Sequence, residues 1–219
     1  MKIVDTHADV LVVLVHGFCR GGKDMLFWRD NLADVFPNIV IADMPAKYSS
    51  FEQCLASLSS TVKQAQPEKY RAVYLAGHSM GGLLLREYLH QSKLPNARKL
   101  VCAGTPHYGS RLADIALLMP FAGFIWPPLK ALKSSARKVV TTPDIPGLEI
   151  GAIVGNNNAH WPGKLFLSDA ADGLVETFSA HAPDAQSVVY TNVPHDPMQY
   201  DIKIVNWIKE FFLTGSFTG

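Results

Sequence analysis

The sequence predicts an α/β protein with a mostly parallel central sheet and helices on both faces of that sheet. Strand-like and helix-like segments alternate along the chain, which is typical of repeated strand–helix units. The run from Val10 to Val15 is apolar without interruption, which indicates a strand covered on both faces. Hydrophobic residues make up 48% of the 219 positions, so the chain can bury the core that such a sheet needs.

The individual elements follow from short apolar runs and from the helical spacing of apolar residues. The predicted strands cover residues 10–15, 38–42, 72–76, 99–104, 148–155 and 187–193. The predicted helices cover residues 22–35, 50–66, 83–89 and 200–213. In a parallel sheet of this kind, functional side chains gather at the carboxyl ends of the strands. The loops that follow the strands are therefore the expected place for a site.

The most informative motif is Gly-His-Ser-Met-Gly-Gly at residues 77–82. The pattern Gly-x-Ser-x-Gly places a serine, here Ser79, on a sharp turn between a strand and a helix. Glycines flank the serine because bulkier side chains would clash in so tight a turn. The alternative is a glycine-rich turn that carries a serine by chance. The strand-like run before the motif and the helix-like segment after it favour the first interpretation.

A serine hydroxyl needs a base to act as a nucleophile, and that base is usually a histidine oriented by a carboxylate. Eight histidines are present, and His195 is the best placed because it follows the last predicted strand. Asp172 lies after the next-to-last strand and is the first choice for the acid, with Asp169 as the reserve. An aspartate before a glycine is otherwise common in turns. The order serine, aspartate, histidine along the chain favours the catalytic interpretation of Asp172.

The negative oxygen that forms during attack on an ester needs N–H donors that are already in place. Met80, the residue after the serine, provides one at the start of a helix, where the helix dipole also favours negative charge. The second donor is expected in the loop after the first strand, at Phe18. His16 and His78 belong to these two motifs and are expected to make structural hydrogen bonds.

Four segments together resemble the lipase and esterase branch of the α/β-hydrolases. They are Val-Leu-Val-His-Gly-Phe at 13–18, Gly-His-Ser-Met-Gly-Gly at 77–82, Gly-Thr-Pro-His-Tyr-Gly-Ser at 104–110 and Asp-Gly-Leu-Val at 172–175. The sequence is most similar to small bacterial triacylglycerol lipases and carboxylesterases. The resemblance implies the α/β-hydrolase fold and hydrolysis of carboxylic esters through an acyl-enzyme, with Ser79 as nucleophile, Asp172 as acid and His195 as base. It implies no cofactor.

The chain departs from this family in two respects. Some bacterial lipases of this kind bind calcium through an aspartate two positions after the catalytic histidine, and this chain has Pro197 there, so no metal is expected. The cysteine pair of secreted relatives has no counterpart. Cys19, Cys54 and Cys102 are instead expected to be buried free thiols.

No strand is evident across about forty residues after the strand near residue 102, and structureless loops of that length are uncommon unless they serve a function. We expect residues 1–219 to form one domain in which residues 110–146 are a cap or lid inserted over the active site. The alternative is one or two ordinary helices that pack apolar faces on the core. The aromatic residues of the segment are expected to contact the substrate: Phe121, Phe124 and Trp126.

Charge and hydropathy argue against several classes of protein. The net charge is +1 and the basic residues are scattered, so no nucleic acid partner is expected. The longest uncharged stretch, Ile115 to Leu129, has 15 residues and three prolines, so it is too short and too broken to span a membrane. Acidic residues and a histidine interrupt residues 1–9, which is unlike a signal peptide and predicts a cytoplasmic protein. The expected partner is a small-molecule or lipid ester.

Three alternative functions stay open at the level of sequence. A phospholipase, thioesterase, amidase or acyltransferase would share the same three catalytic residues. A non-catalytic binding protein with this fold would have lost part of the site. A structural protein that docks through residues 115–129 would not depend on Ser79.

Overall fold

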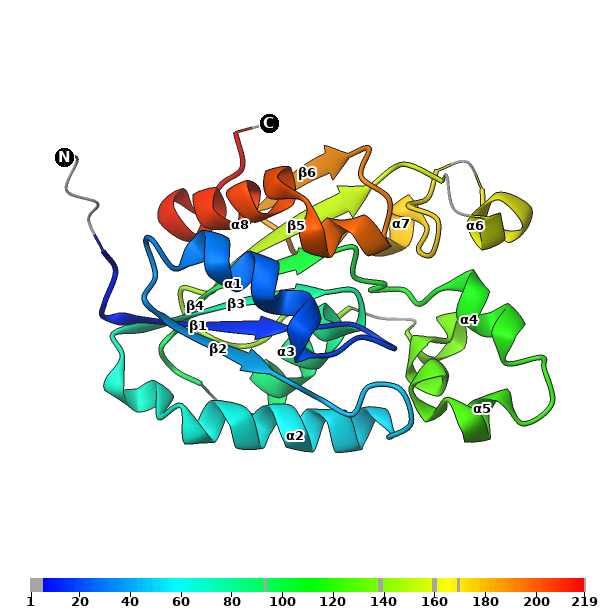
Figure 1. Ribbon diagram of the computed structural model, residues 1–219, viewed down its shortest axis with the longest axis horizontal. Coiled ribbons are helices and arrows are strands. Elements are labelled where there is room, and N and C mark those ends of the chain that lie inside the picture. The colour runs from blue at the N-terminus through cyan, green and yellow to red at the C-terminus, as the bar shows by residue number, and fades with distance from the viewer. Residues whose placement is uncertain (1–5, 93, 138–139, 159–160, 169, 219) are drawn as a thin grey trace.

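A six-stranded parallel sheet forms the centre of the computed structural model (Figure 1). The structure describes residues 6–92, 94–137, 140–158, 161–168 and 170–218. The strand order is β2-β1-β3-β4-β5-β6, and each pair of neighbours is parallel. The strands are β1 (Val10–Val15), β2 (Asn38–Ala42), β3 (Ala72–His78), β4 (Ala97–Ala103), β5 (Glu149–Gly155) and β6 (Ser187–Thr191).

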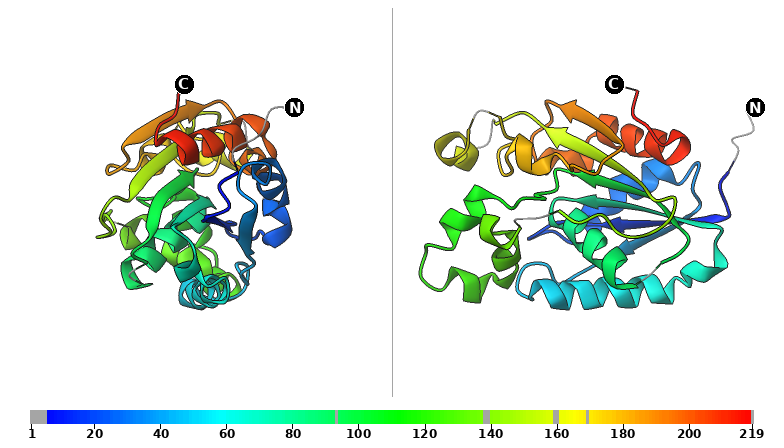
Figure 2. Two further views of the ribbon diagram at one scale, coloured as in Figure 1. Left: turned by 90° about the vertical axis from the view of Figure 1, so that its left-hand side faces the viewer. Right: turned by 180° about the vertical axis from the view of Figure 1, so that it is seen from behind.

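Helices cover both faces of the sheet, with α1 and α8 on one face and α2 and α3 on the other (Figures 1 and 2). Alternate side chains of β1 enter these two cores, because successive residues of a strand point to opposite faces. Within the described residues, no helix is long and apolar enough to cross a membrane. The helices are α1 (Leu26–Leu32), α2 (Phe51–Gln64), α3 (Met80–Ser92), α4 (Arg111–Ala116), α5 (Ala122–Ile125), α6 (Trp161–Phe166), α7 (Thr177–Ala180) and α8 (Ile202–Thr214). The 3₁₀ helices are η1 (Gly22–Met25), η2 (Pro67–Lys69), η3 (Pro127–Leu132), η4 (Ser134–Ala136) and η5 (Asp196–Tyr200).

Most element boundaries agree with the prediction, and the exceptions have local causes. β3 continues to His78, directly up to the turn that holds Ser79. β6 ends at Thr191 rather than at residue 193, because the Val193 N–H donates to Thr191 Oγ1 (3.2 Å) and Pro194 has no N–H to donate. The helix expected over residues 22–35 is divided into η1 and α1.

The segment after β4, residues 110–146, which we name the cap segment, lies beyond the carboxyl ends of the strands and contains no strand among its described residues (Figure 1). It is built from the short helices α4, α5, η3 and η4. Leu129 and Leu132 join the core that α2 and α3 share, and the Ser110 N–H donates to the Leu132 carbonyl at 2.9 Å. The segment therefore packs on the core from one side. Its other side leaves apolar side chains exposed: Leu118, Met119, Phe121 and Phe124.

The three cysteines are free, and two of them are buried as predicted. Cys54 and Cys102 lie in the core between the sheet and α2 and α3. Cys19 is exposed, so the prediction is wrong for this residue. The cause is its place in the loop after β1, where its backbone has a positive φ of 56°.

A buried ion pair ties α3 to the chain that precedes β6. Arg86 Nη2 lies 2.6 Å from Asp184 Oδ2, and both side chains are largely shielded from solvent. The same nitrogen donates to the Thr141 carbonyl (2.9 Å), which adds the end of the cap segment to the contact. Because α3 begins beside Ser79, this pair anchors the helix that supports the serine.

We predict that Asp184→Ala lowers the free energy of unfolding by about 3 kcal/mol, because it leaves the buried Arg86 charge without its counterion. Asp34→Ala is the matched control, since it removes the carboxylate of an exposed pair with Lys209 and is expected to cost less than about 1 kcal/mol. Urea unfolding measures both values, with the denaturant slope unchanged. Equal losses in the two variants would contradict the assignment of Arg86–Asp184 as a stabilising pair.

Candidate functional site

Ser79 lies on a tight turn between β3 and α3, with a positive φ of 54°. Its N–H donates to the Ala103 carbonyl (2.8 Å), and its own carbonyl accepts from the Gly82 N–H (3.1 Å). A Cβ on Gly77 would lie 2.5 Å from the Gly82 nitrogen, and one on Gly81 would lie 2.3 Å from the Val15 oxygen. Only glycine fits at these two positions, so the sequence motif follows from the close approach of the backbone.

Asp172 and His195 form a buried hydrogen-bonded pair. His195 Nδ1–H donates to Asp172 Oδ2 at 2.7 Å, and both side chains are shielded from solvent. The other carboxylate oxygen, Oδ1, accepts from the backbone N–H groups of Leu174 (3.0 Å) and Val175 (2.8 Å). Since Nδ1 carries the proton that bonds to Asp172, Nε2 of the neutral ring is left as an acceptor.

Burial and the carboxylate have opposite effects on the pKa of His195. Burial alone would lower this pKa, because it disfavours the charged ring. The negative charge of Asp172 and its hydrogen bond to the ring outweigh burial, and the pKa of His195 is raised above its ordinary value. His195 can therefore accept a proton at Nε2. Once it has done so, the carboxylate of Asp172 stabilises the protonated ring.

His78 lies next to His195 and is expected to stay uncharged. Its Nε2–H donates to the His195 carbonyl (3.0 Å), and the two ring centroids are 4.7 Å apart. Complete burial holds the pKa of His78 well below its ordinary value, and the nearby His195 lowers it further. The predicted structural hydrogen bond of His78 is confirmed, and His195 has no competing positive charge from this neighbour.

His16 holds the loop after β1 in place. The Met44 N–H donates to His16 Nε2 (2.9 Å), so the ring proton is on Nδ1, which donates to the Gly17 carbonyl (3.0 Å). Burial lowers the pKa of His16, which favours this neutral form. The carbonyl of Gly17 and the N–H of Phe18 belong to one planar trans peptide and point in opposite directions. The hydrogen bond to His16 therefore also sets the direction of the Phe18 N–H.

Two backbone N–H groups near Ser79 are available as donors. Met80 is the first residue of α3, and Phe18 follows Gly17, whose Cα approaches Ser79 so closely that a Cβ there would lie 2.9 Å from the Ser79 Cβ. Neither N–H donates to an acceptor in the part of the chain that the structure describes. Unpaired N–H groups at the start of a helix and in an adjacent loop are suited to bind a negative oxygen.

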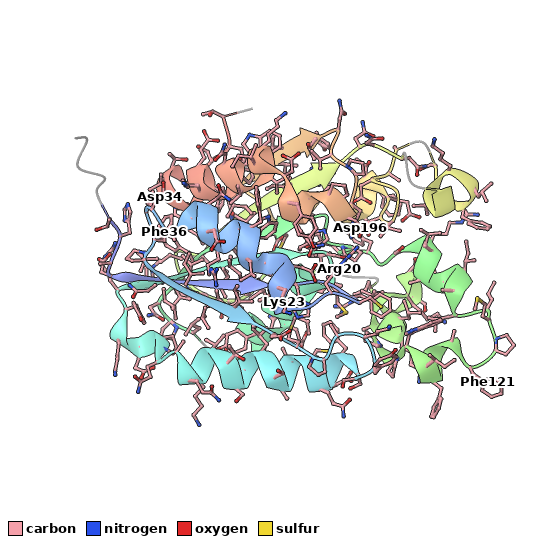
Figure 3. The ribbon with its side chains drawn as sticks, viewed as in Figure 1. Arg20, Lys23, Asp34, Phe36, Phe121 and Asp196 are labelled. Carbon is pink, nitrogen blue, oxygen red and sulfur yellow. The ribbon has the colours of Figure 1, made fainter. Side chains whose placement is uncertain are left out.

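A pocket of about 460 Å³ opens over these groups and is lined by Phe18, Ser79 and His195. One part of its wall comes from the cap segment and the Asp172 loop and is mostly apolar: Leu112, Ala113, Ala116, Trp126, Leu129, Leu132, Leu174 and Val175. The lining also includes three charged side chains: Arg20, Lys47 and Asp196. Figure 3 shows Arg20 and Asp196 next to each other, near the carboxyl ends of the strands. The pocket could hold an ester with an apolar acyl chain.

The structure brings together most of the residues that the sequence singled out, but not all of them. Trp126 lines the pocket, whereas Phe121 and Phe124 are not among its lining residues and have 77% and 83% of their surface exposed. Figure 3 places Phe121 at the outer tip of the cap. The cause is that α5 buries Ala122 in place of its aromatic residues. Asp169, the reserve for the acid, lies outside the described residues.

Several lining residues were missed by the sequence analysis. Leu129 and Leu132 are spaced as on one face of a helical turn, which was a usable signal. Leu174 and Val175 belong to the motif around Asp172, where they also donate the two backbone hydrogen bonds to its carboxylate. Leu112 carried no signal. Among the described residues, no three His, Cys, Asp or Glu side chains gather as metal ligands would.

No protein-family model matches this chain, and no curated protein sequence matches it. Solved structures do resemble it. The mature form of lipase BlEst2 from Bacillus licheniformis has a TM-score of 0.70 at 17% identity, over 97% of this chain and 92% of the lipase. The metagenomic carboxyl esterase MGS0156 has a TM-score of 0.72 at 16% identity, over 97% of this chain and 76% of the esterase.

Phospholipase PlaB from Legionella pneumophila has a TM-score of 0.62 at 15% identity, over 78% of this chain and 45% of the phospholipase. At these identities the likeness is one of fold. Combined with the parallel sheet and the helices on both of its faces, it shows that the chain has the α/β-hydrolase fold.

Proposed function

We propose that this protein is a serine hydrolase that cleaves carboxylic esters through an acyl-enzyme. The observation that carries the proposal is the buried pair of Asp172 and His195, whose histidine lines the same pocket as Ser79 on its strained turn. A histidine whose Nδ1–H is held by a carboxylate has the tautomer that a general base needs. Lipases and esterases among the structures of similar fold support the same class of reaction.

In the first half of the reaction, His195 Nε2 takes the proton of Ser79 as Oγ attacks the carbonyl carbon of the ester. The carbonyl oxygen becomes negative and is stabilised by the N–H groups of Phe18 and Met80. His195 then gives its proton to the alcohol oxygen, the bond between carbon and this oxygen breaks, and the alcohol leaves. Asp172 stabilises the protonated ring while it exists.

In the second half, water takes the place of the alcohol. His195 removes a proton from this water, which attacks the acyl carbon attached to Ser79. The same two N–H groups hold the oxygen, and the proton returns to Ser79 Oγ as the carboxylic acid is released. No cofactor takes part in either half, because every proton transfer uses His195.

The same groups would serve related reactions. The similar fold of a phospholipase keeps a lipid ester within the proposal, and a thioesterase, amidase or acyltransferase would use the same serine and histidine. If the protein only bound a ligand and had no catalytic role, part of the catalytic site should be missing. The intact hydrogen bonds of Asp172, His195 and His16 count against that alternative.

The test is hydrolysis of p-nitrophenyl esters from acetate to palmitate, with Ser79→Ala as the comparison. We predict that the variant loses at least about 1,000-fold in kcat/KM, because it lacks the nucleophile. A maximum at long chains would indicate a lipase, and one at short chains an esterase. If no ester is hydrolysed, or if Ser79→Ala matches the wild type, the proposal is wrong.

The pH dependence tests the assignment of acid and base. Activity requires neutral His195, so kcat/KM of the wild type should rise through an apparent pKa above about 6.5, the ordinary value for histidine. In Asp172→Asn, burial is no longer opposed by a carboxylate. The acidic limb should therefore shift to lower pH while kcat/KM falls by about 10,000-fold.

Asp169→Asn is the matched control for this profile, because it makes the same chemical change three positions earlier in the chain. It should keep most of the activity and leave the acidic limb in place. Loss of activity in Asp169→Asn with retention in Asp172→Asn would reverse the assignment.

A further inference from the structure

The proposed oxyanion donor Phe18 and the proposed base His195 lie on segments that follow different strands. Phe18 comes after β1 and His195 after β6, and the strand order β2-β1-β3-β4-β5-β6 places three strands between these two. The two strands are therefore not joined by the hydrogen bonds of the sheet. Both groups must nevertheless reach the same ester carbonyl, and a misplacement of about 1 Å can cost about 100-fold in rate.

Three contacts join residues 20–28, which continue the chain after the Phe18 loop, to η5, which follows His195. One is an ion pair, and in the other two a hydroxyl and an indole N–H donate hydrogen bonds: Arg20–Asp196, Tyr200–Asp24 and Trp28–Met198. We name these three contacts the clasp. The clasp fixes the chain that leaves β1 against the chain that leaves β6.

The Arg20–Asp196 ion pair is the part of the clasp that lies at the pocket. Arg20 Nη2 lies 2.6 Å from Asp196 Oδ1, and both residues line the pocket (Figure 3). The other four residues of the clasp are not among the lining residues. About a third of each charged side chain is exposed (31% and 32%), so the pair is partly shielded from water.

Each partner of this ion pair is close in the backbone to a group that takes part in the proposed reaction. The Arg20 N–H donates to the Gly17 carbonyl (3.3 Å), which closes a turn that contains Phe18. Asp196 directly follows His195 and is the first residue of η5. Since so few backbone bonds separate these groups, the ion pair limits how far Phe18 and His195 can move apart.

We propose that Arg20 and Asp196 are positioning residues. Their ion pair holds the N–H of Phe18 and the ring of His195 at the separation that the transition state requires. Neither side chain takes or gives a proton. The hydrogen bond from His195 to Asp172 sets the tautomer of the ring, whereas the ion pair sets the distance of the ring from the oxyanion donor. This inference rests on the proposed serine hydrolase function.

The test is a double-mutant cycle on the hydrolysis of p-nitrophenyl butanoate, with Arg20→Gln, Asp196→Asn and the double variant. The measured quantities are kcat and kcat/KM at a pH above the acidic limb, where His195 is neutral. We expect each single variant to lose about tenfold in both, with KM nearly unchanged, because the position of these groups matters in the transition state. The double variant should lose no more than either single variant, because the first substitution already breaks the pair.

The pH profile separates a positioning role from an effect of charge. The negative charge of Asp196 raises the pKa of His195, and the positive charge of Arg20 lowers it. Arg20→Gln should therefore move the acidic limb to higher pH, and Asp196→Asn should move it to lower pH. A role through charge alone predicts opposite effects of the two variants, whereas positioning predicts that kcat falls in both.

Asp34→Asn and Lys209→Gln are the matched controls. Asp34 lies just after α1 and pairs with Lys209 of α8 (2.8 Å), but neither residue lines the pocket. Figure 3 places Asp34 at the end of α1 that is far from Arg20. The kcat of both controls should equal that of the wild type. Urea unfolding should show similar, small losses of stability for the two ion pairs, since neither is fully buried.

The possible failures can be told apart. Wild-type kcat in Arg20→Gln and Asp196→Asn, with Ser79-dependent hydrolysis retained, would overturn the inference and leave the proposed function intact. Losses that multiply in the double variant, or that lie in KM alone, would also overturn it, because the two residues would then act independently or on substrate binding. An equal loss of kcat in the Asp34 and Lys209 variants would assign the effect to general stability. If the wild type shows no Ser79-dependent hydrolysis, the proposed function is wrong, and the inference is wrong with it.

Discussion

The arrangement of the site depends on how the buried carboxylate of Asp172 is satisfied. An ionised carboxylate without partners is very unfavourable in the interior of a protein. Here one oxygen accepts two backbone N–H groups from its own loop, and the other accepts His195 Nδ1–H. The loops after β5 and β6 are therefore held together by the need to pair one charge, and His195 is oriented as a consequence.

The sheet leaves room for this pair at two glycines. A Cβ on Gly155 would lie 2.4 Å from Asp172 Cβ, and one on Gly104 would lie 3.2 Å from the His195 ring. Both glycines lie at the carboxyl ends of strands, one at the end of β5 and one just after β4. The position of the site at this edge of the sheet thus follows from parallel strands that end together and from small residues at those ends.

Three buried histidines near Ser79 differ in their partners, and this difference separates their roles. His16 and His78 bond to backbone groups, and burial lowers the pKa of each. His195 bonds to a buried carboxylate, and its pKa is raised although burial opposes this. Titratable groups whose surroundings move their pKa values apart are a common feature of catalytic sites. His16 and His78 therefore hold backbone segments in place, whereas His195 is suited to act as the base.

The parts of the structure that could be predicted from the sequence are those with a strong local signal. Continuous apolar runs located all six strands, and the glycines of the 77–82 motif located the turn at Ser79. The cap segment was harder, because helices as short as α5 have too few residues for a period to show which side is buried. Phe121 and Phe124 were expected at the pocket for their size alone, whereas Leu129 and Leu132 occupy it. The exposure of Cys19 depends on a backbone turn that its neighbours in sequence do not reveal.

The measurement that tests the central claim most directly is a crystal structure of the protein after reaction with a p-nitrophenyl alkylphosphonate. Such a compound loses p-nitrophenolate and leaves a tetrahedral phosphorus on a reactive serine. We predict phosphorus bonded to Ser79 Oγ, the phosphoryl oxygen about 3 Å from the nitrogens of Phe18 and Met80, and the alkyl chain along the cap wall. An adduct on another residue, no adduct, or a phosphoryl oxygen turned away from these two N–H groups would contradict the account.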